Sequence, residues 1–248
     1  DDIFGPQLLT ALQDKGVNIS GVSISQGVSS GIAVIDIDAS AQNRIIQILG
    51  ANDTCGADEA RAVTRSLVRA STVLLQLEVS LELSIQVASD AASQGKTVVL
   101  DPGPVRPQPL PEEFFQYCTV MTPNETEAQA LVGFPVVDRE SAARAAQWLV
   151  ERGVELAVVK LGDQGACYAT SVGGSYVPPF QVDAVDSVAA GDAFNGALAA
   201  ALAEGQEVPQ AVRMASAAGA LAVTRSGAQD SMPTRQEVEA LMRAQPGP

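Results

Sequence analysis

A turn of small residues, Ala189-Ala190-Gly191, leads into Asp192 at the expected start of a long helix. The first N–H groups of a helix have no internal partner and carry the positive end of its dipole, so this end can bind a phosphate. A carboxylate at the same end can accept a proton from a hydroxyl beside that phosphate. The pattern suggests phosphoryl transfer to an alcohol. The same residues also fit an ordinary helix start that is capped by Asp192 and closely packed.

The elements that position this turn can be predicted from the spacing of apolar residues. From Gly50 onward, expected strands and helices alternate, which is typical of an α/β fold with a mostly parallel sheet between helices. The expected strands are 72–77, 97–100, 118–122 and 156–161, with a hairpin at 165–168 and 175–177. The expected helices are 57–70, 80–93, one beginning near Asn124, 141–152, 191–204, about 208–223 and 234–243.

The first fifty residues have a different pattern. Residues 1–16 are expected to form a helix with Leu8, Leu9 and Leu12 on its buried face. Short segments rich in Val and Ile, at 22–25, 32–37 and 44–49, are separated by polar turns at 26–30 and 38–43. We expect a small antiparallel sheet beside the main domain, although three strands of the main sheet would give the same pattern.

Ligands of open α/β sheets bind beyond the carboxyl ends of the strands, so the residues that follow each strand form a candidate site. Carboxylates, an amide and glycine turns would share this edge of the sheet. These residues are Glu78, Asp101, Asn124, Glu127, Gly162, Gly165 and the segment 186–192.

Each of these pieces also has a structural interpretation. Asn124 and Glu127 fit either a capping box or an oxygen-donor pair for hydrated Mg²⁺. Residues 160–165, Lys-Leu-Gly-Asp-Gln-Gly, fit either a plain turn or a close backbone approach to a nucleotide. Glu78 taken singly could be a surface residue, and segment 222–231 could be a helix C-cap or a cation site. Neither a Walker A loop nor a GxGxxG fingerprint occurs.

Composition limits the chemistry. The 248 residues contain no histidine, which excludes imidazole-based catalysis and leaves Asp, Glu, Lys, Tyr or Cys as the general base. A net charge of −14 without a basic cluster argues against nucleic-acid and membrane-surface partners. Three scattered cysteines suggest reduced thiols and a cytoplasmic protein. No apolar run reaches the length of a membrane span.

Together, the segments AVDSVAAGDAFNGAL, TPNETEA, KLGDQG, the QLE strand end and AVTRSGAQDSMP resemble the ribokinase/PfkB-like carbohydrate kinase family over essentially the whole chain. The resemblance implies one ribokinase-like α/β domain, residues 1–248, with a small β lid at about 21–50. It implies ATP-dependent phosphorylation of the 5-hydroxyl of D-ribose. Its partners would be a small sugar and ATP, and two lids would pair to form a homodimer.

The resemblance also implies roles for individual residues. Asp192 would be the catalytic base, with the backbone amides of 189–192 as an anion hole, and Glu78 would contact the sugar. Asn124 and Glu127 would hold Mg²⁺ through water and contact phosphates, and the nucleotide loop would comprise Lys160, Leu161, Gly162, Asp163, Gln164 and Gly165. A K⁺ site would comprise Asp186, Val188, Ala222, Arg225, Gly227 and Ser231, mostly through carbonyls.

The chain departs from the family pattern at its beginning, because the opening strand and the GGKGAN segment that hold much of the sugar site are absent. We therefore expect a chain that is incomplete at its N-terminus. Two alternative functions stay open: phosphorylation of another sugar or a nucleoside, and an inactive, nucleotide-binding family member. Ser187 and Asp101 are smaller departures, since the family usually has Thr and often Asn there.

Overall fold

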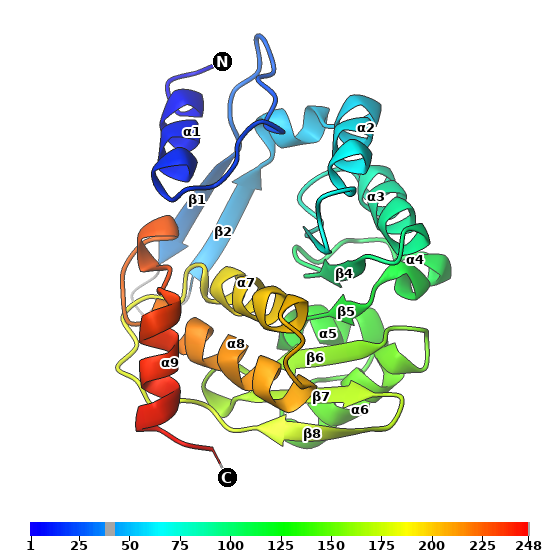
Figure 1. The fold of residues 1–248 in the computed structure, drawn as a ribbon, viewed down its shortest axis with the longest axis vertical. Coiled ribbons are helices and arrows are strands. Elements are labelled where there is room, and N and C mark those ends of the chain that lie inside the picture. Colours follow the sequence, from blue (N-terminus) through cyan, green and yellow to red (C-terminus); the bar gives the residue numbers. More distant parts are fainter. Residues whose placement is uncertain (38–42, 248) are drawn as a thin grey trace.

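Six strands form the main sheet in the order β3-β4-β5-β6-β7-β8 (Figure 1). The structure is a computed structural model that describes residues 1–37 and 43–247. Strands β3 to β6 are parallel, and β7 and β8 continue the sheet in antiparallel fashion. The mostly parallel sheet is therefore confirmed, with the predicted hairpin forming its edge. The strands are β3 (Thr72–Leu75), β4 (Thr97–Leu100), β5 (Val120–Met121), β6 (Leu156–Lys160), β7 (Ala166–Thr170) and β8 (Gly173–Val177).

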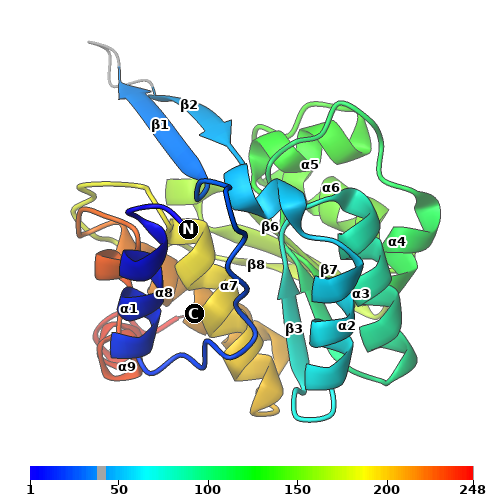
Figure 2. The same ribbon diagram turned by 90° about the horizontal axis from the view of Figure 1, so that it is seen from above.

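Helices cover both faces of this sheet, which gives the three-layer arrangement that the sequence predicts (Figures 1 and 2). One layer contains α3 (Leu81–Ser93), α4 (Glu112–Tyr117), α5 (Glu125–Val132) and α6 (Arg139–Val150), and α2 (Ala57–Ser66) packs beside α3. The other contains α7 (Ala190–Ala203), α8 (Val208–Ala222) and α9 (Arg235–Ala244).

Strand β4 shows how the sequence supports two hydrophobic cores. Val98 and Leu100 pack in one core, whereas Val99 packs in the other, because successive side chains point to opposite faces of a sheet. A strand that is buried on both faces needs apolar residues at every position, which explains the continuous run of Val and Leu here. Buried apolar surface on both sides thus fixes the strands that carry the candidate site.

A two-stranded ribbon, β1 (Ile32–Ile37) with β2 (Asn43–Ile48), projects away from the main sheet (Figure 2). The prediction of a separate antiparallel sheet is confirmed, and its alternative, three strands of the main sheet, is wrong. The predicted strand at 22–25 is also wrong: Val22 and Ile24 are 50% and 58% exposed and pair with no strand in the described residues. A β-rich composition does not make a strand without a neighbour to bond. Most of the predicted turn at 38–43 lies outside the described residues.

Helix α1 (Gly5–Asp14) forms where predicted, but its apolar stripe is not buried. Leu8 is exposed, and Leu9 and Leu12 are only half-buried, so the predicted buried face is wrong. An apolar stripe shows which side of a helix could pack, and burial also needs an element to pack against it.

Other differences concern short elements. Helix α4 was not expected, because six residues after a proline-rich loop are too few to show a helical period, although Phe114 and Phe115 are buried. Helix α2 ends at Ser66 rather than residue 70, and β5 is shorter than the predicted 118–122. Short 3₁₀ helices also occur: η1 (Gly50–Thr54), η2 (Gly162–Gln164) and η3 (Gln229–Ser231). None of the helices in the described residues has the length and apolar character needed to cross a membrane.

Candidate active site

The turn before α7 has a strained backbone. Ala189, which caps the helix, has a φ of 60° and a left-handed conformation. It is the one non-glycine residue with a positive φ in the described ranges 1–37 and 43–247. Such a conformation costs about 1–3 kcal/mol and concentrates at ligand-binding turns. The sequence showed a small residue here but not its strain.

This strained turn leaves backbone donors free at the start of α7. The N–H of Ala190 meets Ser187 O at 3.4 Å, and the N–H of Ala193 meets Ala189 O at 3.0 Å. Among the described residues, no acceptor from another residue meets the N–H of Gly191 or Asp192, and no side chain caps the helix. Two donors without an acceptor from another residue, at the positive end of a helix dipole, can form an anion cradle.

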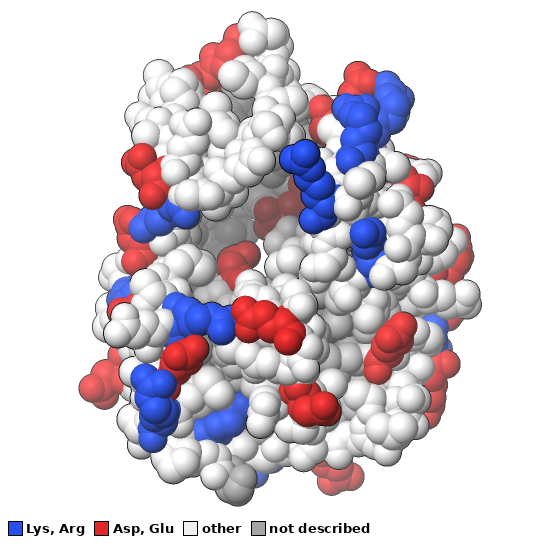
Figure 3. All heavy atoms as spheres, viewed as in Figure 1, with Lys and Arg blue, Asp and Glu red and all other residues white. Residues whose placement is uncertain are grey.

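Asp192 lies at this cradle. Its side chain is accessible to solvent, but partial burial raises the pKa of its carboxyl, and the negative charges of Asp101 and Glu78 raise that pKa further. The charge of Lys160 and the N–H of Asp192 itself oppose this shift. Figure 3 shows a hollow above the first turn of α7 with acidic side chains on its walls. A carboxylate with a raised pKa is better matched to taking a proton from a hydroxyl.

The carboxyl ends of β4 and β6 meet beside this turn, as the sequence predicts. Asp101 directly follows β4, and its Oδ2 lies 2.9 Å from Nζ of Lys160, the last residue of β6. Asn195 of α7 donates a hydrogen bond to the same oxygen at 2.5 Å. Asn195 was missed from the sequence, although its spacing of three residues from Asp192 places both on one face of the helix. Three elements thus join at one carboxylate.

Asn124 and Glu127 form the predicted capping box at the start of α5. The N–H of Asn124 meets Glu127 Oε2 at 2.8 Å, and the N–H of Glu127 meets Asn124 Oδ1 at 2.9 Å. Burial raises the pKa of the Glu127 carboxyl, and the nearby charge of Asp101 raises it further. The capping-box interpretation is thus confirmed. A cation bound here would also offset the repulsion between the carboxylates of Glu127 and Asp101.

No group of three or more His, Cys, Asp or Glu side chains in the described part of the chain could hold a metal ion. A hydrated Mg²⁺ needs only one or two protein carboxylates together with substrate phosphates. Asp101 adds a further observation, because its buried Oδ1 has no hydrogen-bond partner. The oxygen atoms at this edge therefore fit a cation that keeps most of its water ligands better than a cation coordinated by protein groups alone.

The loop at 160–165 turns through η2 at the end of β6. Leu161 is only 1% exposed, so it shapes the loop and its side chain cannot reach a ligand. Gly162 has a φ of 53° and open space where a Cβ would stand, whereas a Cβ at Gly165 would come within 2.3 Å of Val177 O. Gly165 is thus required for packing against the chain after β8, and the expected ligand approach is confined to the exposed part of the loop at Gly162, Asp163 and Gln164.

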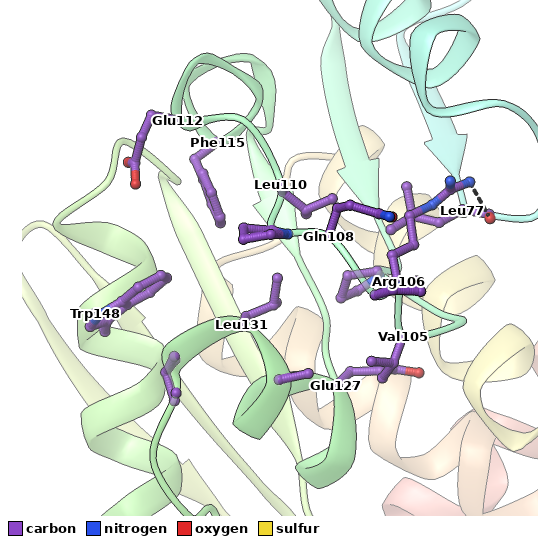
Figure 4. Close-up of a pocket in the computed structure, with 16 residues that line it drawn as sticks. Leu77, Val105, Arg106, Gln108, Leu110, Glu112, Phe115, Glu127, Leu131 and Trp148 are labelled. Carbon is purple, nitrogen blue, oxygen red and sulfur yellow. Dashed lines mark hydrogen bonds between the residues drawn. The ribbon is translucent and has the colours of Figure 1, made fainter.

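Glu78 lies three residues beyond the end of β3, with an exposed side chain. The two residues that flank it are fixed by Arg106, whose Nη2 donates to Leu77 O at 2.9 Å (Figure 4). The same Nη2 donates to Val79 O at 2.6 Å. Sequence reasoning missed Arg106, because its partners are almost thirty residues away. A cavity of about 350 Å³ lies beside it, and Glu127 is also in its lining. Arg106 thus holds the strand end that carries Glu78.

The predicted cation segments are joined through Asp186. Its Oδ1 accepts the N–H of Val188 at 3.0 Å, and its Oδ2 accepts the N–H of Gly227 at 3.1 Å. These bonds lower the pKa of the Asp186 carboxyl. Ser231, in the same segment as Gly227, is buried. Nη2 of Arg225 donates a hydrogen bond to Oε1 of Glu237 at 2.5 Å. The structure therefore brings the two segments together, with Arg225 available to a cation only through its backbone.

A three-layer α/β fold with free helix N–H groups and an accessible carboxylate at the carboxyl edge of its sheet is typical of enzymes that bind phosphate groups. Residues 1–235 match the family described as pfkB family carbohydrate kinase. The chain belongs to this family, so it is a carbohydrate kinase with a ribokinase-like fold.

Individual relatives agree with this assignment. The chain is 34% identical to a ribokinase of Haemophilus influenzae, covering 95% of this chain and 76% of the relative. It is 33% identical to a deoxyribokinase of Salmonella typhi, covering 96% and 77% of the two chains. The structure of Arabidopsis thaliana ribokinase complexed with ribose and ATP has a TM-score of 0.87 at 32% identity, covering 98% of this chain and 79% of the other.

Proposed function

We propose that this carbohydrate kinase transfers the γ-phosphoryl group of ATP to the 5-hydroxyl of D-ribose, giving ribose 5-phosphate and ADP. The observation that carries the proposal is the turn at residues 189–192, where two N–H groups without an acceptor from another described residue adjoin a carboxylate with a raised pKa. Phosphoryl transfer mainly requires positioning and charge stabilisation, and this turn offers both. The names of the relatives support ribose as the acceptor.

In the proposed reaction, Asp192 accepts the proton of the sugar hydroxyl. The hydroxyl oxygen forms a bond to the γ-phosphorus, and the bond between this phosphorus and the β–γ bridging oxygen breaks. ADP leaves with that electron pair. The backbone amides of 189–192 would stabilise the charge on the transferred group, because the N–H groups of Gly191 and Asp192 have no acceptor from another described residue.

Other residues would hold the substrates. We assign Glu78 to the sugar, because its charge is felt at Asp192 and its strand end is fixed by Arg106. The nucleotide would lie along 160–165, with Leu161 and Gly165 contributing only shape. Mg²⁺ would be held through water by Asn124 and Glu127, where it would neutralise phosphate charge next to crowded carboxylates.

A monovalent cation is part of the same proposal. The carbonyls and side chains at Asp186, Val188, Ala222, Arg225, Gly227 and Ser231 would surround K⁺ beside the turn. Since Asp186 already ties the two segments together, a cation there would stabilise the loop that leads into Ala189. The family assignment and the three cysteines also support a cytoplasmic enzyme as a proposal.

A homodimer through the ribbon belongs to the proposal as well. Ile32 lies opposite Ile48, and Val34 lies opposite Ile46, so all four share one face of β1 and β2. They are between 42% and 56% exposed. Contiguous exposed apolar side chains mark an interaction surface. A second copy of the ribbon would offer the same apolar face in return.

The test is release of ADP from Mg·ATP, measured with ribose, 2-deoxyribose, fructose 6-phosphate and adenosine as acceptors. We expect ribose to give the highest kcat/KM. A clear preference for 2-deoxyribose would favour the second candidate, which rests on the similarity to a deoxyribokinase. Preference for either of the other two acceptors would overturn the proposed substrate, and no turnover with any of them would favour an inactive nucleotide-binding protein.

A further inference from the structure

The ammonium group of Lys160 is fixed at the meeting point of three elements. Its Nζ is 2.9 Å from Oδ2 of Asp101, and the two side chains are only 15% and 16% exposed. Asn195 holds the same carboxylate from α7. Because Asp101 follows β4 and Lys160 ends β6, the pair spans the carboxyl edge of the sheet above β5. The position of this ammonium is thus set by the fold.

That position is next to the anion cradle. A Cβ built on Gly191 would lie 3.4 Å from Nζ of Lys160 and 3.7 Å from Oδ2 of Asp101. The side-chain cation therefore faces the same residue whose backbone N–H lacks an acceptor among the described residues. A glycine at this position lets the ammonium lie close to the start of the helix, because even a Cβ here would be in tight contact with Nζ.

The Asp101–Lys160 pair leaves some of its hydrogen-bonding groups without partners. A lysine ammonium has three donors, and Asp101 is the one acceptor that the described residues give it. The other oxygen of Asp101, Oδ1, is buried and has no partner. A pair that served only to join β4 and β6 would be expected to have its remaining hydrogen-bonding groups satisfied, because leaving them unpaired is costly. The unused donors of Lys160 can bind a negatively charged ligand, whereas Oδ1 of Asp101 can accept a hydrogen bond or contact a cation.

The charges around Lys160 favour the same interpretation. The charge of Asp101 raises the pKa of both Glu127 and Asp192, and the charge of Glu78 raises that of Asp192. Lys160 is the side-chain cation whose charge is felt at both Glu127 and Asp192. A phosphoryl group entering this acidic hollow would gain from a cation at the cradle itself.

We propose that Lys160 is a catalytic residue that donates hydrogen bonds to the transferred phosphoryl group of ATP, with Asp101 holding its ammonium beside the N–H of Gly191. The proposal rests on the proposed ATP-dependent phosphoryl transfer. Lys160 moves no proton in this step. It neutralises charge on the phosphoryl oxygens while Asp192 takes the proton of the acceptor hydroxyl.

The test compares nucleotides that differ in the γ-phosphate. Binding of the non-hydrolysable imido analogue of ATP and of ADP, each with Mg²⁺ and without sugar, is measured by calorimetry. For Lys160→Met we expect the analogue to bind about tenfold more weakly or worse, with ADP affinity within about twofold of wild type, because a charge-assisted bond to the γ-phosphate is lost. Lys160→Arg should restore part of the difference.

Lys96→Met is the matched control, because this half-buried lysine precedes β4 at the opposite end of the sheet. It should change neither affinity. Since Lys160→Met leaves Asp101 unpaired, the double variant Asp101→Asn, Lys160→Met provides a neutral pair that should fold and show the same selective loss. Equal losses for both nucleotides, or no loss, in the folded double variant would overturn the proposal.

The outcomes separate this proposal from the proposed substrate. Selective loss of the ATP analogue in a protein that does not phosphorylate ribose would support Lys160 and reject ribose. Normal ribose phosphorylation by Lys160→Met would reject Lys160 and leave the proposed function intact.

Discussion

At the scale of single residues, the site depends on carboxylates whose negative charges act on the pKa of Asp192. Partial burial and the charges of Asp101 and Glu78 raise the pKa of Asp192, and Lys160 opposes them. A base must be deprotonated to act, so its neighbours set the lowest pH at which the enzyme works. Removing the base and removing a neighbour should therefore have different effects.

Replacing the base should abolish most turnover. For Asp192→Asn we expect kcat to fall by about 10²–10⁴-fold, because the amide cannot accept the hydroxyl proton. Binding of Mg·ATP, measured by calorimetry, should be kept. Asp183→Asn, an exposed residue in the segment before the turn, is the control and should keep normal turnover. Retained turnover in Asp192→Asn would reject the assigned role.

Replacing a neighbour should move the pH profile. Glu78→Gln removes a negative charge that raises the pKa of Asp192, so the carboxyl loses its proton at lower pH. Since activity rises as the base deprotonates, the acidic limb of the kcat profile should shift to lower pH. Glu82→Gln, exposed on α3, is the control. An acidic limb that stays in place or moves upward would contradict this electrostatic coupling.

At the scale of elements, function depends on how segments are fastened to one another at the carboxyl edge of the sheet. Asp186 links the segment before α7 to the segment after α8. Arg106 links the loop after β4 to the end of β3. These contacts place backbone groups, so their loss should change the shape of the site without removing any chemical group from it.

The Asp186 contact gives a prediction about monovalent cations. We expect wild-type turnover to be faster in K⁺ than in Na⁺, because K⁺ would stabilise the two joined segments. In Asp186→Ala, which loses both hydrogen bonds, the K⁺ advantage should largely disappear. Initial rates at matched ionic strength measure this, with Asp183→Ala as the control. Equal wild-type rates in the two salts would count against the cation site.

At the scale of the whole molecule, the ribbon β1–β2 stands apart from the main sheet and its helices (Figure 2). The main sheet and its helices enclose two hydrophobic cores, whereas one apolar face of the ribbon is exposed. An isolated two-stranded ribbon is marginally stable in water. Burying its apolar face against a second ribbon would stabilise it. The proposed dimer is thus a prediction about stability as well as assembly.

Charge on the ribbon should disrupt this dimer. For Val34→Asp combined with Ile46→Asp, we expect a monomer under conditions in which the wild type is a dimer, because two carboxylates would face their counterparts. Sedimentation velocity over a range of concentrations measures the change. Val172→Asp is the control, since this valine is 95% exposed at the turn between β7 and β8. A monomeric wild type at high concentration would contradict the prediction.

The sequence by itself determined the fold class, the long helices and the strand-end residues of the site. These depend on local periodicity: a helix repeats every 3.6 residues and a strand every two, so apolar spacing reports each one directly. Parallel strands place their carboxyl ends at one edge, and Asp101, Lys160 and Asp192 could therefore be expected near one another. Local patterns did not predict α4, because this helix is short. They wrongly predicted a strand at 22–25, which has no partner strand in the described residues.

Only the tertiary structure decided which of these groups touch. Asp101 meets Lys160 across 59 residues of sequence and Asn195 across 94. It also decided that Ala189 is strained, that Gly165 serves packing and that α1 leaves its apolar stripe uncovered. Sequence periodicity identifies the surface that an element can offer, but the partner of that surface depends on how distant elements pack.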